Sequence, residues 1–143
     1  MKEKEAADAA VAALEEYIAV SNEVFSAGGK GAEKFKDVAS DAVLLQSQAD
    51  AGQLESEGWR FDGGITNYGY DVTEVDLKEG AESPISYVRL QACYSESAFS
   101  LVDTHGDAVG TPAPNDPTFE YVIGNYDEQW LVSEQNLVSN YCS

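Results

Sequence analysis

Apolar residues in the first part of the chain recur with the period of an α-helix. Between residues 6 and 27 they fall three, four and seven positions apart. These positions are Val11, Leu14, Ile18 and Phe25. The spacing places them on one face of a long helix. Gly28 and Gly29 should end this helix, because glycine readily takes the left-handed conformation that closes a helix.

Two shorter helices are expected after these glycines. The first covers residues 31–40, and the second runs from about Ala42 to Glu57. Asp41 is a suitable N-cap for the second helix, and Gly58 is a suitable stop. The residues expected to face the core are Leu44, Leu45, Gln48, Ala51 and Leu54.

The pattern changes after Trp59, where β-branched and aromatic residues alternate between turn residues and no helical period remains. Strands are expected near Ile65–Leu77, Ile85–Tyr94, Ala98–Asp103, Ala108–Gly110, Thr118–Tyr126 and Gln129–Glu134. In the first strand the apolar side chains change face between Val72 and Val75, which requires a bulge or bend. In the second, Val88 and Leu90 share a face, so Cys93 points to the opposite one.

Helices followed by strands predict an α+β fold of a single domain, residues 1–143. The short turns between the strands favour antiparallel pairing. We therefore expect three N-terminal helices packed on a curved, mostly antiparallel sheet of about six strands, arranged as a cone. A hydrophobic fraction of 43% is that of an ordinary globular protein.

The chain is strongly acidic, with a formal net charge of −18. Residues 1–36 carry five basic and seven acidic side chains, whereas residues 37–143 carry three and nineteen. Such a field repels phosphate backbones and anionic lipids, which excludes nucleic acid as a partner. No apolar run approaches the roughly 20 residues of a membrane span. A solvated acidic surface is the preferred interpretation, and calcium binding or adaptation to high salt are the alternatives.

The two cysteines predict a disulfide. Cys93 lies in an expected strand, and Cys142 is the penultimate residue, in a tail that would otherwise fray. A bridge between them indicates maturation in an oxidising compartment, so we expect a secreted or surface-anchored protein. The N-terminus MKEKEAADAA has acidic residues where a signal peptide has an apolar core. An export or lipid-anchor signal would therefore lie outside this sequence.

The segment around His105 offers two kinds of chemistry. A Cys93–His105 nucleophilic pair is disfavoured, because the cysteine lies mid-strand and twelve residues separate the two. A metal site would have to use Asp103, His105 and Asp107 in one tight turn. We prefer a β-hairpin with Gly106 at the turn position that needs a positive φ. The sequence therefore predicts no metal site and no cofactor here.

A phosphate-binding loop and a catalytic carboxylate are also poorly supported. The segment FSAGGKGAEK follows a helix and has Gly31 where the P-loop needs serine or threonine. The acidic residues expected at strand ends and turns are Asp71, Glu74, Asp76, Glu79 and Glu82. A catalytic group in a cavity should instead be buried beside a polar partner.

Taken together, these elements resemble the nuclear transport factor 2-like, or cystatin-like, cone superfamily. The residues that carry the likeness are Leu14, Tyr17 and Ile18 on the first helix, with Trp130 and Val132 on the closing strand. A nearer resemblance is to small exported or lipid-anchored actinobacterial proteins of that superfamily. It rests on Cys93, Ser97, Val102, Asp103, the WLVS segment of residues 130–133, and Cys142.

The resemblance implies two functions. The preferred one is a non-enzymatic extracytoplasmic domain that binds a protein partner or a small apolar ligand, with dimerisation through the sheet as a further expectation. The alternative is a cofactor-independent isomerase, cyclase or dehydratase that acts in the cone cavity on a small apolar substrate. The aromatic residues proposed to line a pocket are Tyr17, Trp59, Tyr87, Tyr121 and Trp130.

Overall fold

The computed structural model describes residues 2–77, 85–95, 99–110 and 115–142. Helical segments come first and strands follow, as the sequence predicts. The helical segments are α1 (Glu3–Ser26), the 3-10 helix η1 (Ala32–Asp37) and α2 (Asp41–Glu57). The strands are β1 (Arg60–Gly63), β2 (Thr66–Asp76), β3 (Tyr87–Ser95), β4 (Phe99–Val102), β5 (Thr118–Tyr126) and β6 (Gln129–Ser139).

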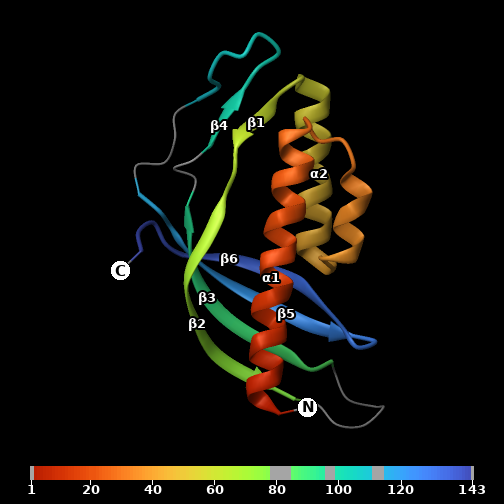
Figure 1. The fold of residues 1–143 in the computed structure, drawn as a ribbon, viewed down its shortest axis with the longest axis vertical. Coiled ribbons are helices and arrows are strands. Elements are labelled where there is room, and N and C mark those ends of the chain that lie inside the picture. Colours follow the sequence, from red (N-terminus) through yellow and green to blue (C-terminus); the bar gives the residue numbers. More distant parts are fainter. Residues whose placement is uncertain (1, 78–84, 96–98, 111–114, 143) are drawn as a thin grey trace.

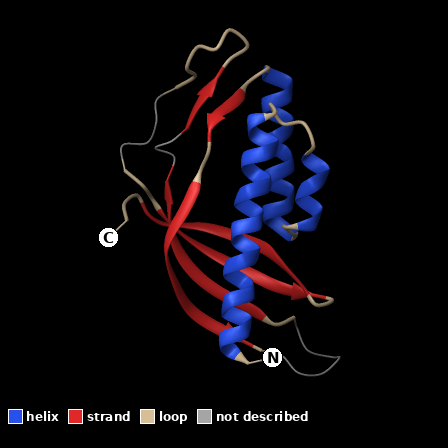
Figure 2. Ribbon diagram, in the orientation of Figure 1, coloured by secondary structure: helices blue, strands red, loops and turns tan. Residues whose placement is uncertain are grey.

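The strands form two sheets. The larger has four strands in the order β2-β3-β5-β6, and the smaller pairs β1 with β4. All of these pairs are antiparallel. Figures 1 and 2 show α1 crossing one face of the curved four-stranded sheet, with the two-stranded sheet near the C-terminal end of α1. The predicted α+β fold of helices on a mostly antiparallel sheet is therefore confirmed.

The inner face of the sheet and the apolar stripe of α1 form the core. Leu14 and Ile18 on α1 are buried against Val88, Leu90 and Ile123 of the sheet. Val88, Leu90 and Ala92 lie at every second position of β3 and face the core. Cys93 follows Ala92 directly, so it points to the outer face, as predicted.

Helix α2 buries Ala51 and Leu54 as predicted, while the predicted Leu44 and Gln48 are only half-buried. Its buried residues are Val43, Ser47, Ala51 and Leu54, whereas Leu45 is 70% exposed. The prediction for Leu45 is therefore wrong. The backbone of α2 approaches the turn after α1 closely, because a Cβ on Gly29 would clash with the Ala51 carbonyl.

The ends of α2 give one confirmed and one incorrect prediction. Gly58 ends the helix in the left-handed conformation at φ 73°, as expected. The N-cap is Ser40, which makes no side-chain capping bond, and Asp41 is instead the first helical residue at φ 50°.

Three strand boundaries differ from the prediction. The short strand β1 was not expected, and β6 continues five residues beyond Glu134 to Ser139. The expected strand at 108–110 is only a single bridge, between Val102 and Ala108. The predicted phase change in β2 is confirmed, because its pairing with β3 shifts between Tyr68 and Asp71 and again between Val72 and Glu74.

The predicted disulfide is present. Cys93 on β3 is bonded to Cys142, with their Cα atoms 5.7 Å apart. Because β5 lies between β3 and β6, the C-terminal tail passes the start of β5, where Thr118 Oγ1 donates to the Tyr141 carbonyl at 2.9 Å. Among the described residues, no helix is both long and apolar enough to cross a bilayer.

Candidate functional site

A groove lies between α2 and β6, and we call it the α2–β6 groove. Its cavity volume is 360 Å³, near the lower end of the range for small-molecule sites. Its lining comes from α1 (Tyr17), α2 (Ala42, Val43, Gln46, Ser47 and Asp50), β5 (Phe119) and β6 (Glu134, Gln135 and Asn136). Residues from four elements therefore meet here, although they are far apart in the sequence.

The groove lies against the edge of β6. Successive side chains of a strand point to opposite faces, yet the lining includes the consecutive residues Glu134, Gln135 and Asn136. Because the cavity contacts all three of these residues, it lies along the backbone edge of β6 and not on one face alone. Strand β6 is an outer strand of its sheet, so this edge faces away from β5.

A pair of buried hydroxyl groups forms the inner wall. The Tyr17 hydroxyl and Ser47 Oγ are 2.9 Å apart, and the residues are 7% and 3% exposed. Burial raises the pKa of the Tyr17 phenol, while its hydrogen bond to Ser47 opposes that rise. The phenol therefore stays protonated at neutral pH and can donate or accept a hydrogen bond.

The rim of the groove is polar and acidic. Asp50 and Glu134 are both exposed, and Gln46 Nε2 donates to Asp50 Oδ1 at 2.8 Å. No lysine, arginine or histidine belongs to the described lining. The groove is therefore suited to neutral polar groups or to cations, and an anion would meet two carboxylates without a compensating charge.

A second buried tyrosine lies deeper in the core. Tyr121 is fully buried, and its hydroxyl accepts a hydrogen bond from Asn67 Nδ2 at 3.1 Å. Asn67 Nδ2 also donates to the Cys93 carbonyl at 3.2 Å. Desolvation raises the pKa of Tyr121, so this phenol too stays neutral.

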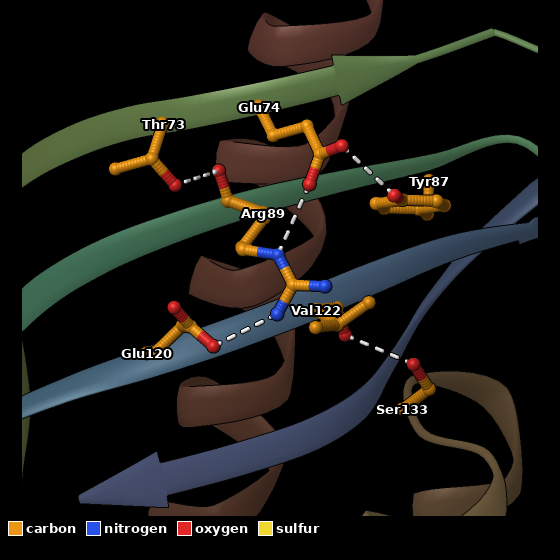
Figure 3. A network of polar contacts seen from close by, with 7 residues as sticks. All are labelled: Thr73, Glu74, Tyr87, Arg89, Glu120, Val122 and Ser133. Carbon is orange, nitrogen blue, oxygen red and sulfur yellow. Dashed lines mark hydrogen bonds and ion pairs between the residues drawn. The ribbon is translucent and has the colours of Figure 1, made fainter. Parts of the chain in front are cut away.

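The outer face of the sheet carries a separate polar network, shown in Figure 3. Arg89 on β3 contacts Glu74 Oε1 through Nε at 3.2 Å and Glu120 Oε1 through Nη1 at 2.9 Å. Tyr87 donates to the other oxygen of Glu74 at 3.0 Å, and Glu120 and Glu74 raise the pKa of Arg89. Thr73 Oγ1 donates to the Arg89 carbonyl at 3.2 Å.

A shallow hollow of 540 Å³ adjoins this network. Tyr87 and Tyr126 line it, and Gly124 lies beside both: it pairs with Tyr87 across the strands, and a Cβ on it would press on the Tyr126 ring. Arg89 is the basic residue of this hollow, and two carboxylates already neutralise it. Among the described residues that line it, the hollow therefore offers no free cation to an anionic ligand.

The five aromatic residues predicted to line a pocket do not meet in one cavity. Tyr17 lines the α2–β6 groove, Tyr87 lines the outer hollow, and Trp59 lines a third cavity near Gly58. Tyr121 is enclosed in the core, and Trp130 is half-buried against it. Tyr17 alone of the five lines the groove.

The segment around His105 forms the predicted hairpin. Asp103 Oδ1 accepts hydrogen bonds from the backbone N–H groups of His105 at 2.8 Å and Asp107 at 3.0 Å. These bonds lower the pKa of Asp103, and Gly106 has φ 82°. His105 is exposed, and Cys93 is bonded to Cys142, so its sulfur is not a free thiolate.

The remaining acidic candidates are dispersed. Glu74 belongs to the Arg89 network, while Asp71 and Asp76 lie on the edge strand β2. Glu79, Glu82 and Ser97 lie outside the described residues. Within the described ranges, no group of three or more His, Cys, Asp or Glu side chains could hold a metal ion.

Sequence reasoning missed most of the groove. Ser47 lies four residues from both Val43 and Ala51, so it is a polar residue on the apolar stripe of α2. That position was a usable signal, because a buried serine needs a hydrogen-bond partner. The partner, Tyr17, is 30 residues away, and only the fold brings the two together.

These observations define an α+β domain with a polar groove at one sheet edge. No family model and no curated protein matches the chain. A solved structure that shares its fold is described as the crystal structure of the intermembrane space region of chloroplast protein ARC6. Its TM-score is 0.64 at 15% identity, over 97% of this chain and 98% of that chain. At this identity the likeness shows the fold alone.

Proposed function

We propose that the protein is a non-enzymatic, extracytoplasmic binding domain of the nuclear transport factor 2-like type and that its binding site is the α2–β6 groove. The observation that carries the proposal is the buried Tyr17–Ser47 hydroxyl pair at the wall of a 360 Å³ cavity. Paired hydroxyl groups at such a wall offer hydrogen bonds to a bound molecule. The polar lining favours a ligand with hydrogen-bonding groups over the purely apolar ligand that the resemblance suggests.

The proposed compartment is supported by the disulfide. Bridges such as Cys93–Cys142 form and persist in oxidising compartments. Secretion and surface anchoring both belong to this proposal.

The binding proposal is tested with small probes and a blocked groove. Small primary amines, polyols and carboxylates would be added singly while thermal unfolding is followed. We expect amines or polyols to raise the melting temperature and carboxylates to leave it unchanged, because the rim is acidic.

The groove is blocked by Gln46→Trp, because Gln46 is exposed and lines the cavity. The matched control is Gln53→Trp, which is exposed on the same helix and outside the described lining. The first variant should lose the stabilisation and the second should keep it. The binding proposal fails if no probe stabilises the protein, or if both variants respond as the wild type does.

A cofactor-independent isomerase, cyclase or dehydratase is the second candidate. One observation favours it: a carboxylate, Asp50, and a protonated phenol, Tyr17, line the same cavity. Asp50 would remove a proton next to a carbonyl group, and Tyr17 would donate a hydrogen bond to the oxygen that becomes negative. The test is to follow the replacement of such protons by deuterium in small ketones dissolved in deuterated water. Exchange by the wild type that is absent in Asp50→Asn would establish catalysis in place of binding alone.

A further inference from the structure

Strand β6 already accepts one added segment along part of its outer edge. Val132 donates its N–H to the Val38 carbonyl at 3.0 Å, and its carbonyl accepts the Ser40 N–H at 2.9 Å. Residue Ala39 thus forms a parallel bridge with Val132. The chain then leaves the edge, because α2 begins at Asp41.

Beyond this bridge the edge has no backbone partner among the described residues. From Glu134 to Leu137 the strand pairs with β5 one residue to one, so this stretch is regular. Leu137 is 57% exposed and Val138 is 49% exposed. A regular, partly apolar edge is a template for pairing with another chain.

The opposite edge of the same sheet is protected. Strand β2 carries Asp71, Glu74 and Asp76, and its pairing shifts register twice. Charges of this kind on an edge strand oppose pairing with another strand. The pairing of β6 with β5 also shifts register twice, before Glu134 and after Leu137, but the four residues between these shifts carry a single charge, Glu134. The two edges therefore differ in charge, and the edge of β6 has fewer carboxylates to oppose the addition of a strand.

The groove adds side-chain recognition to this edge. Its cavity contacts Glu134, Gln135 and Asn136 of β6 on one side and α2 on the other. The groove therefore follows the edge of β6 beyond the bridge between Ala39 and Val132. Alternate side chains of a strand laid there would point into the cavity toward Tyr17 and Ser47. In strand addition, main-chain hydrogen bonds supply affinity and such pockets supply specificity.

Charge identifies the occupant. The rim carries Asp50 and Glu134, and the whole chain has a net charge of −18. A second copy would bring the same acidic rim, and like charges repel. We infer that the α2–β6 groove binds an extended, lysine- or arginine-bearing segment of a basic partner protein, which adds as a strand to β6. This inference rests on the proposed function and names its partner.

The probe is a capped synthetic peptide in which lysine and valine alternate, and its binding is followed by fluorescence anisotropy. We expect it to bind, and we expect the same peptide with glutamate in place of lysine not to bind. A third peptide is N-methylated at alternate residues, which removes the N–H groups on one edge. It should bind weakly, because strand addition needs those donors. Amide exchange at residues 134–137 should slow when the lysine peptide binds.

Two charge variants of α2 test the location. Asp50→Lys should lower the affinity for the lysine peptide by about tenfold or more, because it places a cation in the groove. Glu57→Lys makes the same change in net charge at the exposed far end of the helix. It should change the affinity by less than about twofold, because solvent and salt screen the interaction between this exposed charge and a peptide in the groove. Thermal unfolding of both variants would show that they fold.

Several results would overturn the inference. Equal binding of the N-methylated peptide would mean electrostatic attraction without strand addition, and equal effects of the two variants would place the peptide elsewhere. A dimer of the protein alone, with residues 134–137 protected, would make a second copy the occupant. If amines or polyols bind the groove and the peptide does not, this inference fails and the proposed function stands. If neither binds, both fail.

Discussion

Asn22 shows how one side chain fixes a turn of the chain. Its Oδ1 accepts the Ile65 N–H at 2.8 Å, and its Nδ2 donates to the Ile65 carbonyl at 3.0 Å. Ile65 is 3% exposed and lies in the break between β1 and β2. The amide of Asn22 thus takes the place of a neighbouring strand and satisfies two backbone groups that water cannot reach.

We predict that Asn22→Ala lowers the free energy of unfolding by about 1 to 3 kcal/mol, because it leaves buried backbone groups without partners. Asn22→Asp should also be destabilising, because one carboxylate oxygen can still accept the Ile65 N–H but the other replaces a donor and faces the Ile65 carbonyl. Urea denaturation measures both losses. The control is Ser26→Ala on the same helix, whose hydrogen bond is exposed and whose effect should stay within about 0.5 kcal/mol. Equal losses in Asn22→Ala and Ser26→Ala would contradict this account.

At the scale of elements, α2 shows the limit of reading an apolar pattern. The sequence offers Leu45 as an inward residue, yet Leu45 is exposed and the helix buries Val43 and Ser47. Gly29 packs directly against Ala51, so the turn after α1 leaves no room for a side chain at residue 29. Hydrophobicity predicted that a helix forms here, and the space available between the elements decided its rotation.

The disulfide joins elements whose order was unknown from the sequence. It ties the C-terminal tail to β3 across β5, and the two cysteines are 49 positions apart along the chain. In the chain-entropy model, a loop of this length stabilises the folded state by about 4 kcal/mol.

Cys93→Ser with Cys142→Ser should therefore lower the free energy of unfolding by about 2 to 4 kcal/mol in urea. Wild-type protein treated with a reducing agent should show the same loss, and the double variant should not respond to that agent. Two reactive thiols in the unfolded, unreduced wild type would disprove the bridge.

For the whole molecule, the two buried phenols make stability depend on pH. Desolvation raises the pKa of Tyr17 and of Tyr121 above the usual value of 10.0. Below pH 10 both phenols are neutral in the folded and in the unfolded protein, so their full contribution to the free energy of unfolding is present. Above pH 10 the unfolded chain loses these protons while the folded protein keeps them, so the free energy of unfolding falls as the pH rises.

We expect this decline to be shallower in Tyr121→Phe, even if the variant is less stable at neutral pH. Urea denaturation at a series of alkaline pH values measures the slope. Tyr141→Phe is the control, because that side chain is 63% exposed and should leave the slope unchanged. A slope in Tyr121→Phe equal to that of the wild type would refute the assignment.

What the sequence by itself determined is local. The period of α1, the stop at Gly58, the hairpin at residues 103–107 and the bulges of β2 all follow from residues close together in the chain. The pairing of Cys93 with Cys142 was also predictable, because the chain has only two cysteines.

The tertiary structure decided the rotation of α2, the unprotected edge of β6 and the groove between them. Tyr17 and Ser47 are 30 residues apart, and β6 lies a further 80 or more residues along the chain. No local pattern records that such segments become neighbours. Packing volume and strand order bring them together, so the candidate site becomes visible only in the folded chain.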